Sequence, residues 1–179
     1  MKFQELNIPG AWRIEFDGLV DDRGSFRRHF CEIEFQKRGI DSKVRQANLS
    51  KNTHKHTLRG LHYQCDPHWE AKTISCIKGK IYGVVVDLRP KSASYLKWVP
   101  TELDADVPIS LHVPKGCAIG WITLQDSTIL HYYMSEIYVP EAGAGIRYND
   151  PRFGFIWPVK PAVISTKDQS FPDWKEPHL

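Results

Sequence analysis

The chain has 179 residues, of which 41% are hydrophobic and 25% are charged, and its formal net charge is +3. These proportions are typical of a folded protein and argue against the disordered, collagen-like and coiled-coil classes. Acidic and basic residues are interleaved, so the sequence carries no broad basic footprint for nucleic acid, while small anionic ligands stay possible. We expect one domain over residues 1–179.

Short runs rich in β-branched and aromatic residues, separated by turn residues, predict strands through most of the chain. The segment Cys31–Gly39 comes first and is ambiguous, because its apolar residues at 31, 33 and 35 fit either a short helix or a strand. The expected strands further along are Thr73–Ile77, Ile81–Leu88, Tyr95–Pro100, Ile109–Pro114, Trp121–Leu124 and Ser127–Met134. The first two are joined by a compact link that contains glycine, so we predict a β-hairpin over Thr73–Leu88.

Many short strands with almost no helix predict an all-β sandwich or barrel. Inward side chains alternate along a barrel strand. Leu130, Tyr132 and Met134 should therefore share one face of their strand, and His131 and Tyr133 the other.

No segment is long enough to span a bilayer as a helix. The longest nearly apolar run, Cys117–Leu124, has eight residues, against about 20 for a transmembrane helix. Glu5 and Pro9 stand where a secretory signal would be apolar. The four cysteines form no CxxC pair, and we read them as reduced thiols. We expect a cytoplasmic protein with no membrane partner.

The densest group of polar residues is NTHKHTLRGLHYQ, Asn52–Gln64. A histidine in a barrel is a plausible general base, because its ordinary pKa lies near neutral pH. Gly60 inside this strand indicates a bulge that re-aims its neighbours. Alternation therefore does not decide which of Arg59 and His62 points inward.

Taken singly, Lys72 has the character of a strand-edge charge and Asp168 that of a turn aspartate. They occur together with a series of motifs in one order: DDRGSF at 21, RQANLS at 45, RGLHYQ at 59, VDLR at 86, PKGCAIGW at 114, NDP at 149 and WP at 157. With these motifs the chain resembles the nucleotide-sugar 3,5-epimerases typified by dTDP-4-dehydrorhamnose 3,5-epimerase. The resemblance runs from about Asp21 to Asp168.

The resemblance implies a cupin-type jelly roll that works as a homodimer without a metal or other cofactor. It implies a nucleoside-diphosphate 4-keto-6-deoxy sugar as substrate, in which the C4 carbonyl acidifies the protons on C3 and C5. It makes His62 the base and Asp168 the carboxylate that orients it. Lys72 would stabilise the enolate oxygen, and Tyr132 would protonate the opposite face. Whether C3, C5 or both are inverted stays open.

The resemblance also implies binding roles. Arg59 and Arg23 would contact the diphosphate, to which a guanidinium fork is well suited. Gln46, Asn48 and Tyr138 would line the nucleotide and sugar part of the site.

Three positions depart from the family pattern. Ile119 stands at an active-site position where the family usually has histidine in PxGxAHGF. Arg28 replaces an acidic residue that helps to recognise thymine, and Leu19 replaces an aromatic residue before the DxRG motif. With the four catalytic residues present, we expect a working epimerase with an altered sugar or base.

Two alternatives stay open. A metal-dependent cupin could use imidazoles among His54, His56, His62 and His68, although no carboxylate follows HKH at the usual distance. A non-catalytic nucleotide-sugar binding protein is the second alternative, since Ile119 removes a polar contact. Enzymes of the resembled type supply deoxysugars for surface polysaccharides, such as lipopolysaccharide O-antigen, or for glycosylated metabolites.

Overall fold

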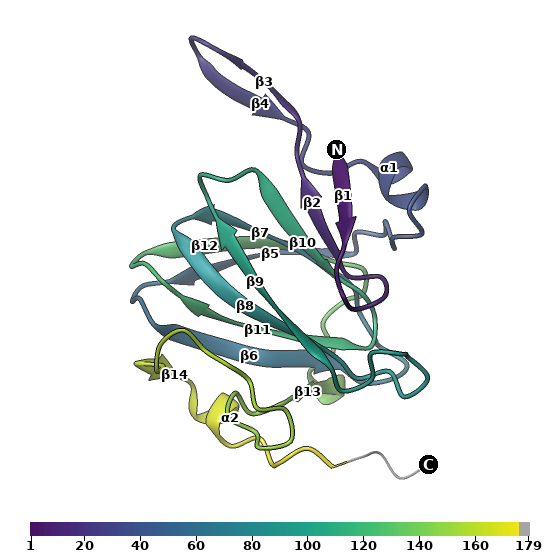
Figure 1. Ribbon diagram of the computed structural model, residues 1–179, viewed down its shortest axis with the longest axis vertical. Helices are drawn as coiled ribbons and strands as arrows, with labels where there is room; N and C mark the ends of the chain where they lie inside the picture. The colour runs from purple at the N-terminus through teal and green to yellow at the C-terminus, as the bar shows by residue number, and fades with distance from the viewer. Residues whose placement is uncertain (176–179) are drawn as a thin grey trace.

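The structure is a computed structural model and describes residues 1–175. Two six-stranded sheets pack face to face, and nearly all strand pairs are antiparallel (Figure 1). The first sheet has the order β1 (Lys2–Glu5), β2 (Trp12–Glu15), β10 (Ile109–Val113), β7 (Lys72–Lys78), β12 (Thr128–Met134), β5 (Gln46–Asn52). The second has the order β13 (Gly143–Gly145), β6 (Thr57–Gln64), β11 (Cys117–Thr123), β8 (Lys80–Asp87), β9 (Trp98–Asp104), with β14 (Val163–Ile164) parallel to β6. The predicted all-β class is confirmed.

The remaining elements are short. A separate two-stranded ribbon is made of β3 (Gly18–Asp21) and β4 (Gly24–Arg27), and Pro140–Ala142 form a 3₁₀ turn. The helices are α1 (Glu32–Gln36) and α2 (Thr166–Gln169). The ambiguous segment Cys31–Gly39 thus contains a helix. Two acidic residues in its first turn interact favourably with the positive end of the helix dipole. None of the helices in residues 1–175 is long and apolar enough to cross a membrane.

Buried hydrophobic side chains form three clusters. The main core lies between the sheets and includes Ile74, Ile119 and Leu130. A second cluster covers the outer face of the second sheet, where Val84 and Val86 meet side chains of the segment 146–174. The third packs around Phe35 of α1. Each of the three clusters contains residues of one or both sheets.

The predicted hairpin over Thr73–Leu88 is wrong. β7 pairs with β10 and β12 in the first sheet, whereas β8 pairs with β11 and β9 in the second. Gly79, with φ of +77°, carries the chain from one sheet to the other. The unbroken apolar run of β8 is the sequence signal of a strand that is covered on both faces. Val85 faces the main core, while Val84 and Val86 face the outer cluster.

Asp87 anchors the end of β8. Its carboxylate is fully buried and accepts hydrogen bonds from Arg89 at 2.8 Å and from the hydroxyls of Ser92 and Ser94 at 2.6 Å. Burial alone would raise the pKa of Asp87, but these hydrogen bonds lower it to about 2. The VDLR motif of the sequence is therefore a structural anchor.

The β3–β4 ribbon projects away from the two sheets (Figure 1). All eight of its residues are exposed. They include Leu19, Val20 and Phe26, which are 76%, 75% and 77% exposed.

Candidate active site

A cavity of about 620 Å³ lies between the two sheets. One wall comes from β5, β7 and β12 of the first sheet, and the other from β6 and β11 of the second. Residues of β14 and α2 close one side. Eight predicted site residues line it: Gln46, Asn48, Arg59, His62, Lys72, Tyr132, Tyr138 and Asp168.

A bulge in β6 places Arg59 and His62 on the same face. On β11 their partners are Trp121 and Ile119, so three steps along β6 match two steps along β11. Gly60 sits in the bulge with φ of +106°, and a Cβ there would lie 2.7 Å from the backbone of Gly120. A side chain at position 60 would therefore clash. The predicted bulge is confirmed, and both polar side chains reach the cavity.

Asp168 holds the imidazole of His62. Its Oδ1 lies 2.7 Å from His62 Nε2, and its Oδ2 accepts the Gly60 N–H at 3.1 Å. Ser165 caps α2 by accepting the Asp168 N–H at 3.1 Å, which fixes the start of the helix. Asp168 is only 3% exposed. This predicted pair is therefore assembled from residues 106 positions apart.

The Asp168 carboxylate is ionised at neutral pH. Burial by itself would raise its pKa, but the hydrogen bond and charge of His62, together with the Gly60 N–H, bring the pKa below its usual value. An anion beside the imidazole stabilises the protonated ring that forms when histidine takes up a proton. Because Nε2 faces Asp168, Nδ1 is the ring nitrogen available to a ligand.

Lys72 is held by a carboxylate that the sequence analysis missed. Its ammonium makes a very short ion pair with Glu70 and donates to the backbone oxygen of His62 at 3.4 Å. The other carboxylate oxygen of Glu70 accepts the Gln64 N–H at 3.1 Å. The spacing of Glu70 and Lys72 could have indicated this pair, because residues two apart in an extended segment lie on the same face. The lysine therefore enters the cavity as half of a buried pair.

Tyr132 projects from the opposite wall to His62, because β12 and β6 belong to different sheets. Burial raises the pKa of its phenol, an effect that the Arg59 charge opposes and the Glu70 charge reinforces. Tyr132 is consequently a protonated phenol at neutral pH. The cavity thus has an imidazole on one side and a proton donor on the other.

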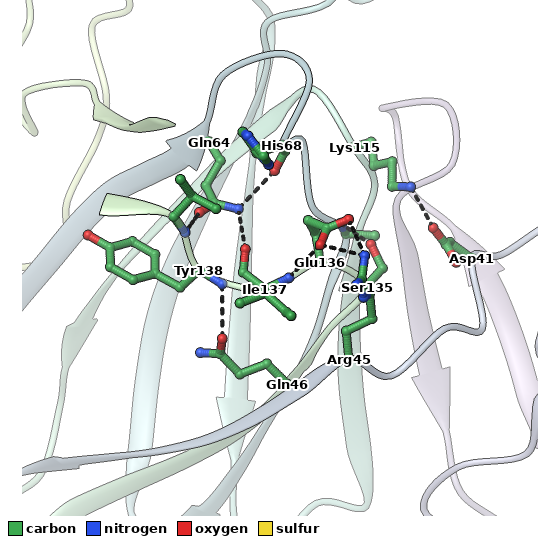
Figure 2. A network of polar contacts seen from close by, with 12 residues as sticks. Asp41, Arg45, Gln46, Gln64, His68, Lys115, Ser135, Glu136, Ile137 and Tyr138 are labelled. Carbon is green, nitrogen blue, oxygen red and sulfur yellow. Dashed lines mark hydrogen bonds and ion pairs between the residues drawn. The ribbon is translucent and has the colours of Figure 1, made fainter. Parts of the chain in front are cut away.

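The mouth of the cavity is held by amide side chains from both walls. Gln46 Oε1 accepts the Tyr138 N–H at 2.9 Å (Figure 2). Its Nε2 donates to Asn48 Oδ1 at 2.9 Å. From the other wall, Gln64 Oε1 accepts the Val139 N–H at 2.6 Å. The segment that carries Tyr138 is therefore tied to β5 and to β6.

Arg59 is oriented by Asn52, whose side-chain oxygen accepts from its Nε at 2.7 Å. This contact engages one edge of the guanidinium. The Nη2 atom makes a longer contact, 3.5 Å, with the backbone oxygen of Lys51.

Three predicted binding residues lie outside the lining of this chain's cavity. Arg23 is on the projecting ribbon, where it pairs with Asp21 at 2.6 Å, and Arg28 pairs with Glu34 at 3.0 Å. Ile119 lies directly across from His62 on β11 but is 2% exposed and belongs to the main core. The sequence motifs carried no information on which face of a sheet these residues would occupy.

The four histidines of the metal-cupin alternative do not gather. Within residues 1–175, no group of three or more histidine, cysteine, aspartate or glutamate side chains could hold a metal ion. His62 is instead engaged by Asp168.

An imidazole–carboxylate pair, a buried ammonium and a protonated phenol in the cavity of an all-β sandwich are the groups of an enzyme that works by acid–base chemistry. The family model described as dTDP-4-dehydrorhamnose 3,5-epimerase matches residues 5–176. The dTDP-4-dehydrorhamnose 3,5-epimerase of Sinorhizobium fredii is 36% identical over 173 residues, which is 96% of this chain and 89% of that protein.

Solved structures agree. The dTDP-4-dehydrorhamnose 3,5-epimerase of Elizabethkingia anophelis superposes with a TM-score of 0.93 at 31% identity, over 97% of this chain and 96% of that one. The Bacillus anthracis enzyme, with TDP and PPi bound, has a TM-score of 0.92 at 35% identity, over 96% and 98%. The chain belongs to the dTDP-4-dehydrorhamnose 3,5-epimerase family of isomerases.

Proposed function

We propose that the protein epimerises a thymidine-diphosphate 4-keto-6-deoxy sugar at C3, C5 or both. The observation that carries this proposal is the placement of the His62–Asp168 pair and Tyr132 on opposite walls of one cavity. Epimerisation needs a proton to leave one face of a carbon and another to arrive on the opposite face. A base and an acid on facing sheets meet that requirement.

The proposed reaction starts at a carbon next to the C4 ketone. His62 Nδ1 takes the proton, the C–H electron pair moves into a C–C double bond, and the carbonyl electrons move onto oxygen. Lys72 stabilises the enolate, because a fixed cation in a site with little water interacts strongly with developing charge. The enolate then collapses as its carbon takes the phenolic proton of Tyr132. Solvent returns a proton to the phenolate and removes the one on the imidazole.

Deuterium uptake in heavy water tests this proposal. The thymidine, cytidine and guanosine diphosphate forms of 4-keto-6-deoxyglucose are offered in parallel and analysed by mass spectrometry. Two deuterons indicate exchange at both carbons, and one indicates a single centre. We expect His62→Ala to abolish uptake. Tight binding without uptake by the wild-type protein would refute the epimerase and favour the binding-protein alternative.

A homodimer is part of the proposal, and the β3–β4 ribbon supports it. Leu19, Val20 and Phe26 are at least three-quarters exposed on a ribbon that projects from the sheets, as expected for apolar side chains that a partner covers. Arg23, on the same ribbon, would then contact diphosphate in the cavity of the second copy. Light scattering should give twice the chain mass for the wild type.

A ribbon variant sharpens the test. Phe26→Ser should shift the measured mass toward the monomer, whereas Ile156→Ser, which removes a 70% exposed apolar side chain elsewhere, should not. A monomeric wild type would overturn the dimer without affecting the proposed chemistry.

A cytoplasmic location and a role in making deoxysugars for surface polysaccharides complete the proposal. The four cysteines are free thiols, which suits a reducing compartment. Cell fractionation with an antibody to the protein tests the location.

A further inference from the structure

One buried polar group in the cavity wall has no hydrogen-bond partner. Trp121 lines the cavity and is 6% exposed, and its Nε1 contacts no acceptor in the part of the chain that the structure describes. Trp98 donates to Phe153 O at 2.9 Å and Trp157 to Tyr148 O at 2.8 Å. Trp174 Nε1 also has no acceptor among residues 1–175, but it lies outside the cavity lining. Buried N–H groups are nearly always paired in folded proteins. An unpaired indole in a ligand cavity therefore calls for an acceptor from the ligand.

The surroundings of Trp121 indicate which part of the ligand that is. Trp121 lies across from Arg59 on the neighbouring strand. Its ring centroid is 6.4 Å from that of Tyr132, with the planes tilted by 59°. It therefore stands next to the phenol that acts on the sugar carbons in the proposed reaction. The hydroxyl and keto oxygens of a hexose are acceptors, and an indole N–H can only donate.

We propose that Trp121 donates its indole N–H to an oxygen of the sugar and so recognises the sugar half of the substrate. The inference rests on the proposed function for the identity of the ligand. It adds a specificity residue that the sequence analysis did not single out. It also predicts that the contact contributes to binding of the sugar nucleotide but not of the bare nucleotide.

Trp121→Phe tests the inference, because it keeps an aromatic ring and removes the donor. Titration calorimetry compares thymidine diphosphate-glucose with thymidine diphosphate on the wild type and the variant. We expect the variant to bind the sugar nucleotide about three- to tenfold more weakly, the size of effect typical for one neutral hydrogen bond, and to bind thymidine diphosphate equally well. Trp98→Phe is the matched control, since it removes an indole N–H outside the cavity, and it should bind both ligands like the wild type.

A second measurement does not depend on how the variant folds. In the wild-type protein with ¹⁵N-labelled tryptophan, thymidine diphosphate-glucose should shift one of the six indole N–H resonances that thymidine diphosphate leaves in place. Trp→Phe variants identify the resonance. No selective shift of the Trp121 signal, or a loss of affinity equal for both ligands, would overturn the inference. Failure of the epimerase proposal appears separately, as absence of deuterium uptake by the wild type.

Discussion

Replacing Asp168 by asparagine should reverse the tautomer of His62. The Gly60 N–H can only donate, so the side-chain oxygen of asparagine would face Gly60 across the present 3.1 Å contact. The amide NH₂ would then face His62 Nε2, 2.7 Å from the carboxylate in the structure. Two donors cannot share a hydrogen bond, so Nε2 would have to become the acceptor. The ring proton would move to Nδ1, the nitrogen that takes the proton from the sugar in the proposed mechanism.

The expected loss is large although the change in shape is small. The wrong tautomer in a comparable base–carboxylate pair costs about 10⁴-fold in rate, and loss of the charge that stabilises the imidazolium acts in the same direction. We therefore expect Asp168→Asn to lower the rate of deuterium uptake by about 10³- to 10⁴-fold, which corresponds to about 4–5.5 kcal/mol in the barrier. Affinity for thymidine diphosphate should change little, because the proposed mechanism places the pair at the sugar.

The assay is deuterium uptake under single-turnover conditions, with thymidine diphosphate binding measured on the same preparation. Asp106→Asn, an exposed aspartate in the turn between β9 and β10, controls for loss of a negative charge and should keep the wild-type rate. If Asp168→Asn keeps uptake within tenfold of the wild type, the tautomer argument is refuted.

Three further outcomes are expected. Tyr132→Phe should form the inverted product at least about 10²-fold more slowly, yet it should still take up deuterium, because the base can return a deuteron to the face from which it took the proton. Analysis of the product by NMR distinguishes inversion from exchange without inversion. Equal loss of inversion and of deuterium uptake would contradict an acid on the opposite wall. Glu70→Gln should leave the buried Lys72 ammonium without its anion and lower the free energy of unfolding, measured with urea, by about 3 kcal/mol. The control Glu136→Gln breaks a surface ion pair with Arg45 and should lower the free energy of unfolding by under about 1 kcal/mol. The pKa of Asp87 is about 2 in the folded protein against 3.8 in the unfolded chain, so the carboxylate is ionised in both states above about pH 4. Its contribution of about 2 kcal/mol to the free energy of unfolding should be lost as the pH falls from about 4 to 2. The stability of Asp87→Asn should therefore fall less than that of the wild type over this range, and parallel curves of stability against pH would contradict the argument.

Several strands of the main sheets were readable from the sequence, but β1, β2 and β5 were not, and the bounds of β9 and β11 differ from the predicted ones. The partners of the strands were not readable either. Residue composition identified β7, β8, β10 and β12 because β-branched and aromatic side chains cluster there. Composition does not say which edge a strand pairs along, and the glycine link between β7 and β8 suits a hairpin as well as a crossing between sheets. The clue was the unbroken apolar run in β8, which requires cover on both faces.

The site was partly predictable for a similar reason. The family motifs brought His62, Lys72, Tyr132 and Asp168 together, and the structure places all four around one cavity. The motifs did not identify Glu70, because an acidic residue before a strand looks like an ordinary surface charge until its burial is known. Trp121 was missed for the same reason, because a tryptophan in an apolar strand looks like an ordinary core residue until its surroundings are known.

The distance along the chain between the two members of the imidazole–carboxylate pair has a consequence for biosynthesis. The ribosome makes β6 within the first 64 residues, but the carboxylate that orients its histidine is made more than a hundred residues later. His62 therefore has no orienting carboxylate until α2 has been made and has packed against β6. In the proposed mechanism, the packing of this short helix against β6 completes the base.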